Sequence, residues 1–250
     1  MTANAEPLHL DAFSGIVEYE PGDLTITVGA ATTIAELDAV TAANTQWCPL
    51  SPWGGDDGSV GATIATATGG PYAHALGFPR DLVLGFECVD GTGKVLRPGG
   101  KVVKNVAGFD LVRLMTGAWG TLGAITQVSL RLRARPAVDE TWFVAADPSR
   151  ATEVQLALRR SATPPIACEV LDGGVLVRIA GNAAFVSAAR ASVQSQGVAQ
   201  PRDGAAWAEL RKTARRRAPK TALSAEVRAL NESVRRAFDP AGILNPGIMG

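Results

Sequence analysis

Histidine and cysteine are scarce in this chain of 250 residues, which has two of the first and three of the second. The cysteines, Cys48, Cys88 and Cys168, are scattered and form no Cys-x-x-Cys pair. This spacing argues against a structural zinc site, an iron–sulfur cluster and a disulfide framework. We therefore expect no metal site, and a protein from a reducing compartment.

Net charge and long apolar segments are also missing. Lys and Arg number 24, as do Asp and Glu, so the formal net charge at pH 7 is zero and nothing favours nucleic acid or an anionic membrane as a partner. Residues 1–6 have neither the basic stretch nor the apolar core of a signal peptide. No apolar run approaches the ~18–20 residues that span a bilayer. We expect a cytoplasmic protein without a transmembrane segment, with any membrane association made through partners.

Glycine, in contrast, is abundant and unevenly distributed. Sixteen of the 27 glycines lie between Gly54 and Gly123, and nine of these form two clusters at residues 54–70 and 117–123. Glycine costs backbone entropy on folding, so such a concentration indicates unusual backbone conformations or the close approach of another group. Consecutive N–H groups in a glycine turn at a helix N-terminus form a concave set of donors for an anion such as a pyrophosphate. The clusters are therefore a candidate cofactor site.

Each cluster also has a simpler interpretation. Residues 54–61 could be a surface loop with tight turns, and residues 117–126 could be strands that pack closely. Two other nucleotide motifs are absent, because Gly100-Lys101 is followed by Val102 and no G-x-G-x-x-G lies between a strand and a helix. A P-loop and a Rossmann NAD site are therefore not expected.

The first half of the chain is typical of short strands and one clear helix. Strands are predicted at residues 24–28, 82–89 and 125–132, which are rich in β-branched and apolar residues. Thr33 and Glu36 have the spacing of a capping box, in which a Thr hydroxyl and a Glu carboxylate satisfy the first N–H groups of a helix. Apolar residues follow at helical spacing and predict a helix after Thr33.

Composition shifts at residues 133–136, where we place a domain boundary. The order predicted beyond it is strand, helix, strand, strand, helix, which resembles a split βαβ, ferredoxin-like unit. A further helical region is predicted to end at Asp239-Pro240-Ala241-Gly242. The predicted strands are 141–145, 167–171 and 175–179, and the predicted helices are 148–160, 183–195 and 205–238.

Motifs in the first half and at the end of the chain resemble one flavoprotein family. Residues 58–65 (GSVGATIA) resemble its glycine turn that opens a helix, and residues 104–117 and 120–126 (GTLGAIT) resemble its next two segments. Residues 238–247 (FDPAGILNPG) are similar to its terminal signature. The family is that of the PCMH-type flavin-binding domain, shared by flavoproteins of the vanillyl-alcohol-oxidase and D-lactate-dehydrogenase types. The run at residues 103–110 (VKNVAGFD) resembles the FAD-binding subunits of bacterial glycolate oxidases in particular.

The resemblance covers about residues 16–135 and 235–248, and it implies an α+β fold. It implies a truncated PCMH-type FAD-binding domain over residues 1–135, formed by the second subdomain of the family, with a mainly antiparallel sheet and flanking helices. A small ferredoxin-like cap is expected at residues 136–235. A C-terminal segment, residues 236–250, is expected to return to the flavin domain.

The resemblance further implies which residues bind the cofactor, a non-covalent FAD. Pro52, Gly54 and Gly55 would lie near the flavin. Gly58 and Gly61, which have no side chain, would leave room for the pyrophosphate. Gly123 and Ile125 would lie beside the dinucleotide, with the Ile125 backbone meeting the adenine. No catalytic residue is predicted. The candidates are Pro52, Gly54, Gly55, Gly58, Ser59, Gly61, Ala62, Thr63, Gly120, Gly123, Ile125 and Asn245.

The chain also departs from the family pattern. The family's domain begins with a small βαβ subdomain whose glycine-rich loop wraps the pyrophosphate from the other side, and nothing in residues 1–14 is glycine-rich. No residue is placed for a covalent histidyl link. The two histidines, His9 and His74, both lie outside the cap, where active D-2-hydroxyacid dehydrogenases of this type are expected to use clustered histidines and arginines.

Two functions from different classes are consistent with these features. The first is an FAD-binding subunit of a glycolate oxidase-like 2-hydroxyacid oxidoreductase complex, whose partners would be a larger FAD-linked catalytic subunit and an iron–sulfur subunit. The second is a degenerate flavin-domain subunit that serves as a scaffold and holds no FAD. A third possibility is that the natural start lies upstream of Met1.

Five other features have a functional and a simpler interpretation, and the simpler one is favoured. Asp56-Asp57 could bind a metal ion, but a solvated turn is expected because no third ligand is near in sequence. His74 is expected to be a loop histidine rather than a flavin or substrate contact. Arg80-Asp81 is expected to be a structural ion pair or a loop anchor rather than catalytic. The basic residues within 211–217 are expected on a solvated helix face. Trp47, Trp53 and Trp119 are expected in the core or at subunit contacts.

Overall fold

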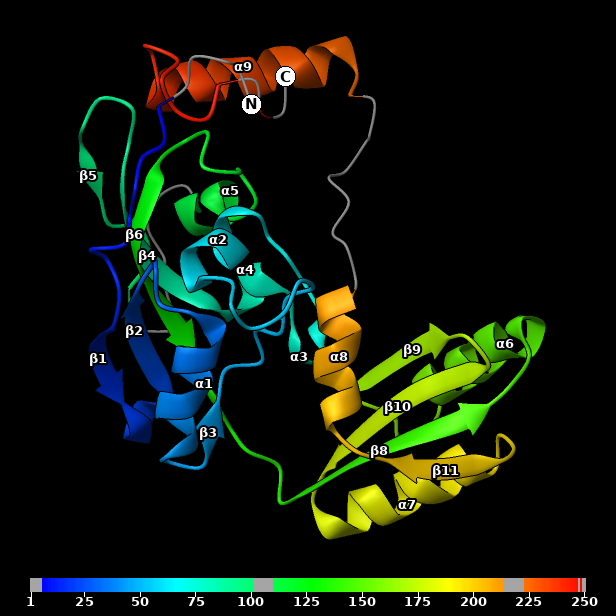
Figure 1. Cartoon of the computed structure of the whole chain (residues 1–250). Helices are drawn as coiled ribbons and strands as arrows, with labels where there is room; N and C mark the ends of the chain where they lie inside the picture. The colour runs from blue at the N-terminus through cyan, green and yellow to red at the C-terminus, as the bar shows by residue number, and fades with distance from the viewer. Residues whose placement is uncertain (1–5, 101–109, 214–222, 247, 249–250) are drawn as a thin grey trace.

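The computed structural model describes residues 6–100, 110–213, 223–246 and 248. Two antiparallel sheets organise them, one in each half of the chain (Figure 1). Residues 103–109 of the family-like run at 103–110 lie outside the described residues. Gly247 and residues 214–217 of the basic run also lie outside them. Among the described residues, no helix combines the length and the apolar character needed to cross a bilayer.

The first sheet has five strands in the order β1-β2-β6-β4-β5, and each neighbouring pair is antiparallel. The central strand, β6, comes from residues far along the chain from β2, so this pairing closes the first half of the fold. The predicted strands at 24–28, 82–89 and 125–132 are confirmed to within one residue at each end. The strands are β1 (Ile16–Glu20), β2 (Thr25–Gly29), β4 (Val83–Val89), β5 (Val95–Leu96) and β6 (Ala124–Arg131).

Helices cover this sheet and form the first core. The predicted capping box begins α1, because the Thr33 hydroxyl accepts a hydrogen bond from the Glu36 N–H (3.1 Å) and the Glu36 carboxylate accepts one from the Thr33 N–H (2.8 Å). Leu37 of α1 and Ile64 of α2 are fully buried against Val28 and Val128 of the sheet. The helices are α1 (Ile34–Ala42), α2 (Val60–Ala65), α3 (Ala73–Leu76), α4 (Pro79–Leu82) and α5 (Leu111–Met115), with a 3-10 turn, η1 (Pro21–Asp23).

The second sheet has four strands in the order β11-β8-β10-β9, all antiparallel. In chain order this is 4-1-3-2, with a helix after the first and third strands, which is the ferredoxin-like arrangement predicted from the sequence. The predicted N-cap, Asp147, accepts hydrogen bonds from the N–H groups of Ser149 and Arg150. The elements are β8 (Val138–Ala145), α6 (Pro148–Arg159), β9 (Ala167–Leu171), β10 (Gly174–Gly181), α7 (Ala183–Gln194) and β11 (Ala199–Arg202).

Two helices follow the second sheet, α8 (Ala205–Thr213) and α9 (Ala225–Phe238). The prediction of continuous helix over residues 205–238 is therefore wrong. Ser224 is extended and its hydroxyl caps the start of α9, because a Ser oxygen satisfies a first-turn N–H better than another helical residue would. Figure 1 shows α8 between the two sheets and α9 beyond the end of the first sheet near α5.

A third core lies between the two halves of the chain. The Tyr72 ring lies 5.6 Å from that of Trp47, edge-on, and 6.5 Å from that of Trp207 in α8. Trp207 is 2% exposed, and its indole N–H donates to the Thr141 hydroxyl of β8 (3.1 Å). Aromatic side chains from both halves are thus packed into one cluster. A short two-stranded sheet, β3 (Gln46–Trp47) with β7 (Arg133–Ala134), lies where the chain passes from one half to the other.

Candidate functional site

The first group of predicted cofactor residues lies in the connection between β3 and α2, of which we call residues 54–59 the glycine loop. Gly54 and Gly55 have φ of +109° and +97°, a backbone conformation that side chains rarely adopt. A Cβ added at Gly54 or Gly58 would meet nothing within 4 Å, whereas one added at Gly55 would meet Cγ of Lys212 at 3.4 Å. Pro52, just before the loop, is buried. Gly54 and Gly58 therefore face open space in which a ligand has room.

The N-terminus of α1 sets the direction of the loop's peptide groups. The N–H of Ile34 donates to the Gly58 carbonyl (3.0 Å), and the N–H of Ala35 donates to the Asp56 carbonyl (3.1 Å). A trans peptide points its C=O and N–H in opposite directions, so the N–H groups of Asp57 and Ser59 point away from α1. Neither donates to another residue in the part of the chain that the structure describes. These two N–H groups are free to bind an anion.

The first turn of α2, in contrast, has no free N–H. The Val60 N–H donates to the Thr32 carbonyl and the Gly61 N–H to the Ala30 carbonyl, both at 2.8 Å. The next N–H groups, of Ala62 and Thr63, donate to the side chain and the carbonyl of Ser59. The donor set predicted for a pyrophosphate at this helix start is therefore used inside the protein, and the free donors lie one step earlier, in the glycine loop.

Gly61 is a packing residue in this structure. A Cβ on Gly61 would lie 2.6 Å from the Ala30 Cβ and 2.9 Å from the Ala30 carbonyl oxygen, which is too close for either contact. The absence of a side chain therefore lets α2 approach the end of β2. Of the hydroxyls expected as donors, that of Ser59 caps α2 and that of Thr63 donates to the Ser59 carbonyl (2.9 Å).

The second group of predicted residues lies at the other end of α2. The last carbonyls of this helix, those of Ile64 and Ala65, accept hydrogen bonds from the N–H groups of Gly117 (3.0 Å) and Trp119 (2.7 Å). A helix of this length spans about 9 Å. The two glycine clusters, which are about 60 residues apart in sequence, are thereby brought to the two ends of one short helix.

The C-terminal segment reaches this second group through Asn245. Its side-chain N–H donates to the Trp119 carbonyl (2.6 Å), and a Cβ on Gly120 would lie 2.7 Å from the Asn245 nitrogen. Trp119 has φ +56°, which is uncommon for an aromatic residue. Gly123 leaves room for the Met115 methyl, which lies 2.8 Å from where its Cβ would be. Ile125 is 5% exposed in the first core and pairs with β4, so its contact with an adenine stays a prediction.

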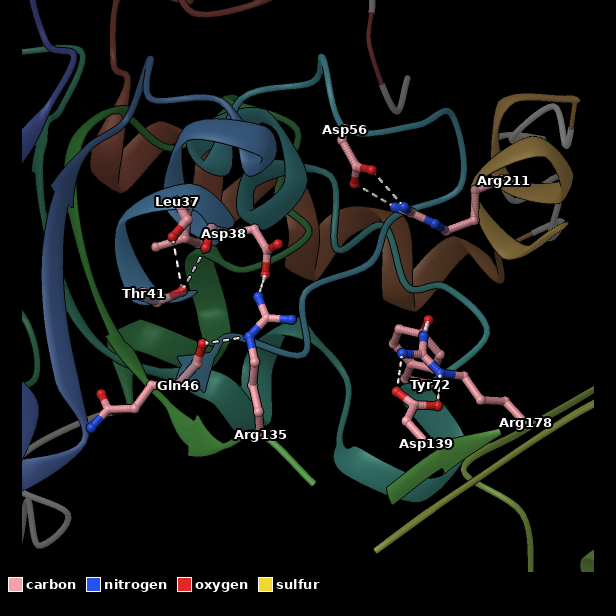
Figure 2. A network of polar contacts seen from close by, with 10 residues as sticks. All are labelled: Leu37, Asp38, Thr41, Gln46, Asp56, Tyr72, Arg135, Asp139, Arg178 and Arg211. Atoms are coloured by element: carbon pink, nitrogen blue, oxygen red, sulfur yellow. Dashed lines mark hydrogen bonds and ion pairs between the residues drawn. The ribbon is translucent and has the colours of Figure 1, made fainter. Parts of the chain in front are cut away.

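Helix α8 contacts the glycine loop through Arg211. The guanidinium donates two hydrogen bonds to the two carboxylate oxygens of Asp56, both at 2.6 Å (Figure 2). Arg211 is only 7% exposed. Asp56 and Asp57 lie in a bend with solvent-accessible side chains, as expected of a solvated turn, but Asp56 is also ion-paired. The expectation of a solvated helix face is wrong for Arg211. Among the described residues, no three His, Cys, Asp or Glu side chains lie close enough to hold a metal ion.

Two more arginines form polar contacts near the junction of the two halves (Figure 2). Arg178 of β10 donates to the Tyr72 hydroxyl and pairs with Asp139 of β8. Burial, with the nearby charge of Arg211, lowers the pKa of Arg178 to about 10, so it stays charged at neutral pH. Arg135 pairs with Asp38 of α1 (2.6 Å) and also donates to the carbonyl of Gln46.

The remaining candidates have structural positions. His74 lies exposed on α3, where its ring meets Phe78 edge-on at 5.6 Å. The Asp81 carboxylate accepts a hydrogen bond from the Phe78 N–H (2.9 Å) at the start of α4 and lies 4.0 Å from Arg80, so the structural interpretation of this pair is confirmed. Trp47 packs on Tyr72, as expected of a core residue. All three cysteines are buried.

Comparison with known proteins identifies the first half of the chain. Residues 2–99 match the family described as FAD binding domain. Over these residues the chain is similar to that family. A second similarity extends over most of the chain. In it, 207 residues are 32% identical to glycolate oxidase subunit GlcE of Escherichia coli (strain K12). This match covers 82% of the chain and 58% of GlcE. A shorter match, 34% over 128 residues, is to glycolate oxidase subunit GlcD of Bacillus subtilis (strain 168), covering 50% of the chain and 27% of GlcD.

Solved structures agree with the fold of the FAD binding domain. A structure of alkyldihydroxyacetonephosphate synthase superposes with a TM-score of 0.68 at 19% identity, over 80% of this chain and 44% of that one. This likeness supports the fold alone, and the PCMH-type α+β class predicted from the sequence is confirmed. The chain spans little more than half the length of GlcE and less than half of the synthase.

The residues of the glycine loop fit an anionic group such as the FAD pyrophosphate. Gly54 and Gly58 leave open space, and the N–H groups of Asp57 and Ser59 are free. The exposed carboxylate of Asp57 opposes an anion at the same place. Arg211 was missed from the sequence because its partner, Asp56, lies 155 residues away, and no local pattern links the two.

Proposed function

We propose that this chain is the FAD-binding subunit of a glycolate oxidase-like 2-hydroxyacid oxidoreductase complex in the cytoplasm. The observation that supports this most strongly is the 32% identity to GlcE over 82% of the chain, together with the FAD binding domain. The partners we propose are a larger FAD-linked catalytic subunit and an iron–sulfur subunit. The cysteines of this chain are buried and scattered, so the iron–sulfur centre would belong to a partner.

The glycine loop would hold the pyrophosphate of FAD in this proposal. Gly54 and Gly58 leave room for its close approach, and the N–H groups of Asp57 and Ser59 would donate to its oxygens. Gly120 and Asn245 would lie at the far end of α2 from the phosphates. FAD supplies the capacity to take up hydride and pass on electrons, while the protein binds and orients it. Substrate acid–base groups are proposed on the catalytic partner, because this chain has no histidine in its ferredoxin-like half.

Titration of the purified chain with FAD tests the proposal. We expect flavin bands in the visible spectrum of the chain as purified, or saturable quenching of flavin fluorescence when FAD is added. Gly58→Val should weaken binding, because the side chain fills space that is open in the structure. Gly22→Val is the matched control, since Gly22 is also exposed with nothing within 4 Å of its Cβ position. A chain that neither carries nor takes up FAD would overturn the proposal for the isolated subunit.

A second candidate function is a scaffold subunit that holds no FAD. It is favoured by the bonded N–H groups of the α2 first turn and by the negative charge of Asp57 in the loop. The two functions differ in an assembly experiment with the larger flavoprotein subunit. A scaffold would form the same complex when Gly58 is replaced by Val, with the flavin content of the complex unchanged. If the complex with Gly58→Val contained less flavin, by about one FAD per copy of this chain, the scaffold function would be refuted.

A further inference from the structure

Helix α8 holds the glycine loop by side chain and backbone together. The Arg211 guanidinium donates to both oxygens of Asp56, and the Arg211 carbonyl accepts a hydrogen bond from the Gly54 N–H (2.8 Å). Lys212, the next residue, lies over Gly55. A paired, bidentate arginine fixes both distance and angle, so these contacts define where the loop lies relative to α8.

The burial of Arg211 makes this contact obligatory. Its side chain is 9% exposed, and its Nε is buried without a hydrogen-bond partner among the described residues, whereas the Asp56 side chain is 39% exposed. A buried charge needs a partner of opposite charge, and removing one member of such a pair leaves the other uncompensated. Arg211 therefore depends on Asp56 to stay in place, and the loop that carries Asp56 is tied to α8.

The pair also sets the charge of the loop. Asp56 and Asp57 are consecutive, and both flank the N–H groups that are free to bind an anion. Arg211 neutralises Asp56 and leaves Asp57, which is exposed and has no ion-pair partner among the described residues, as the uncompensated charge of the loop. Without Arg211 the loop would present two carboxylates where a pyrophosphate is to bind, and like charges repel.

We infer that Arg211 is a positioning residue for the cofactor: it orients the glycine loop through Asp56 and removes one negative charge from it. FAD binding and the docking of α8 are then coupled, so that each stabilises the other. This inference rests on the proposed function, because it takes FAD as the ligand of the loop. It assigns to a residue of the ferredoxin-like half a role in a site that lies in the FAD binding domain.

Four variants of the full chain test the inference, each titrated with FAD by flavin fluorescence. Arg211→Met should weaken FAD binding about tenfold, within the range usual for coupled sites. The double variant Arg211→Met with Asp56→Asn removes the exposed charge as well and should regain part of the loss. Arg211→Lys keeps the charge without the bidentate geometry and should lie between the wild type and Arg211→Met. Arg135→Met is the matched control, because it breaks another arginine–aspartate ion pair of the same length, with Asp38 at 2.6 Å, outside the glycine loop.

Hydrogen exchange of residues 54–59 provides a readout that does not need FAD. Exchange in this segment should rise in Arg211→Met and stay at the wild-type rate in Arg135→Met, because Arg211 bonds to Asp56 of the loop whereas the Arg135 side chain bonds to Asp38 and Gln46. Equal FAD affinity in these two variants, or a double variant no better than Arg211→Met, would overturn the inference while leaving the proposed function in place. A wild-type chain that binds no FAD would overturn the proposed function, and the exchange rates would then decide alone whether Arg211 orders the loop.

Discussion

Replacing Gly61 by alanine should lower the free energy of unfolding, whereas FAD affinity should be affected less than by a replacement at Gly58. The added Cβ would lie 2.6 Å from the Ala30 Cβ and 2.9 Å from the Ala30 oxygen, whereas carbon atoms pack favourably at about 3.5–4.0 Å. α2 and the end of β2 must therefore separate by about 1 Å, which costs about 1–3 kcal/mol as overpacking. The hydrogen bond from the Gly61 N–H to Ala30 would weaken, costing about 1 kcal/mol, and the better helix propensity of alanine would offset a similar amount.

A net loss of roughly 1–3 kcal/mol should lower Tm by roughly 2–12 °C in a chain of this size, which thermal unfolding followed by circular dichroism would measure. Gly58→Ala is the control, since its Cβ meets nothing, and its Tm should be unchanged or slightly raised. FAD affinity should show the opposite order, with the larger loss at Gly58. The reasoning fails if Gly61→Ala melts like the wild type and loses FAD, because the start of α2 would then contact the cofactor directly.

Three further outcomes follow from the described contacts. Asp57→Asn should tighten FAD binding a few-fold at low salt, because like charges about 4 Å apart in water repel by about 1 kcal/mol, and the gain should shrink at high salt. Thr33→Ala should lower the free energy of unfolding by about 0.5–2 kcal/mol in urea titrations, with rescue by Thr33→Ser, because the capping box is lost. Burial raises the pKa of Cys48 to about 12, so this thiol ionises at a lower pH in the unfolded chain than in the folded one. The free energy of unfolding should therefore be at its full value below about pH 9 and should fall as the pH rises above it. A thiol reagent at pH 8 should accordingly label Cys48 only after unfolding.

Local patterns predicted the elements well, because each is fixed by neighbours in sequence. The capping box of Thr33, the Asp147 N-cap and the hairpin around Gly173 all depend on residues within a few positions, and each is found as expected. One local error, continuous helix through Ser224, arose because a helix-forming composition does not reveal an N-cap within it. Another is the strand predicted at 141–145, which begins at Val138.

The candidate site was harder to predict, because its geometry depends on distant partners. The sequence shows where the glycines of both clusters lie, but it does not show which residues pack against each of them. Gly61 meets Ala30, and Gly120 meets Asn245 from the other end of the chain. Arg211 was assigned to solvent because a helix with several basic residues usually exposes them, and its burial depends on an aspartate from the other half of the protein.

The aromatic cluster between the two sheets has a consequence for how the molecule unfolds. Tyr72 belongs to the first half and Trp207 to the second, and each completes the burial of the other. Cleaving the chain near Pro136 would leave both rings facing water, so separately produced halves should aggregate or remain partly melted. The two sheets are thus expected to lose structure in a single cooperative transition, although the ferredoxin-like sheet has a hydrophobic core of its own.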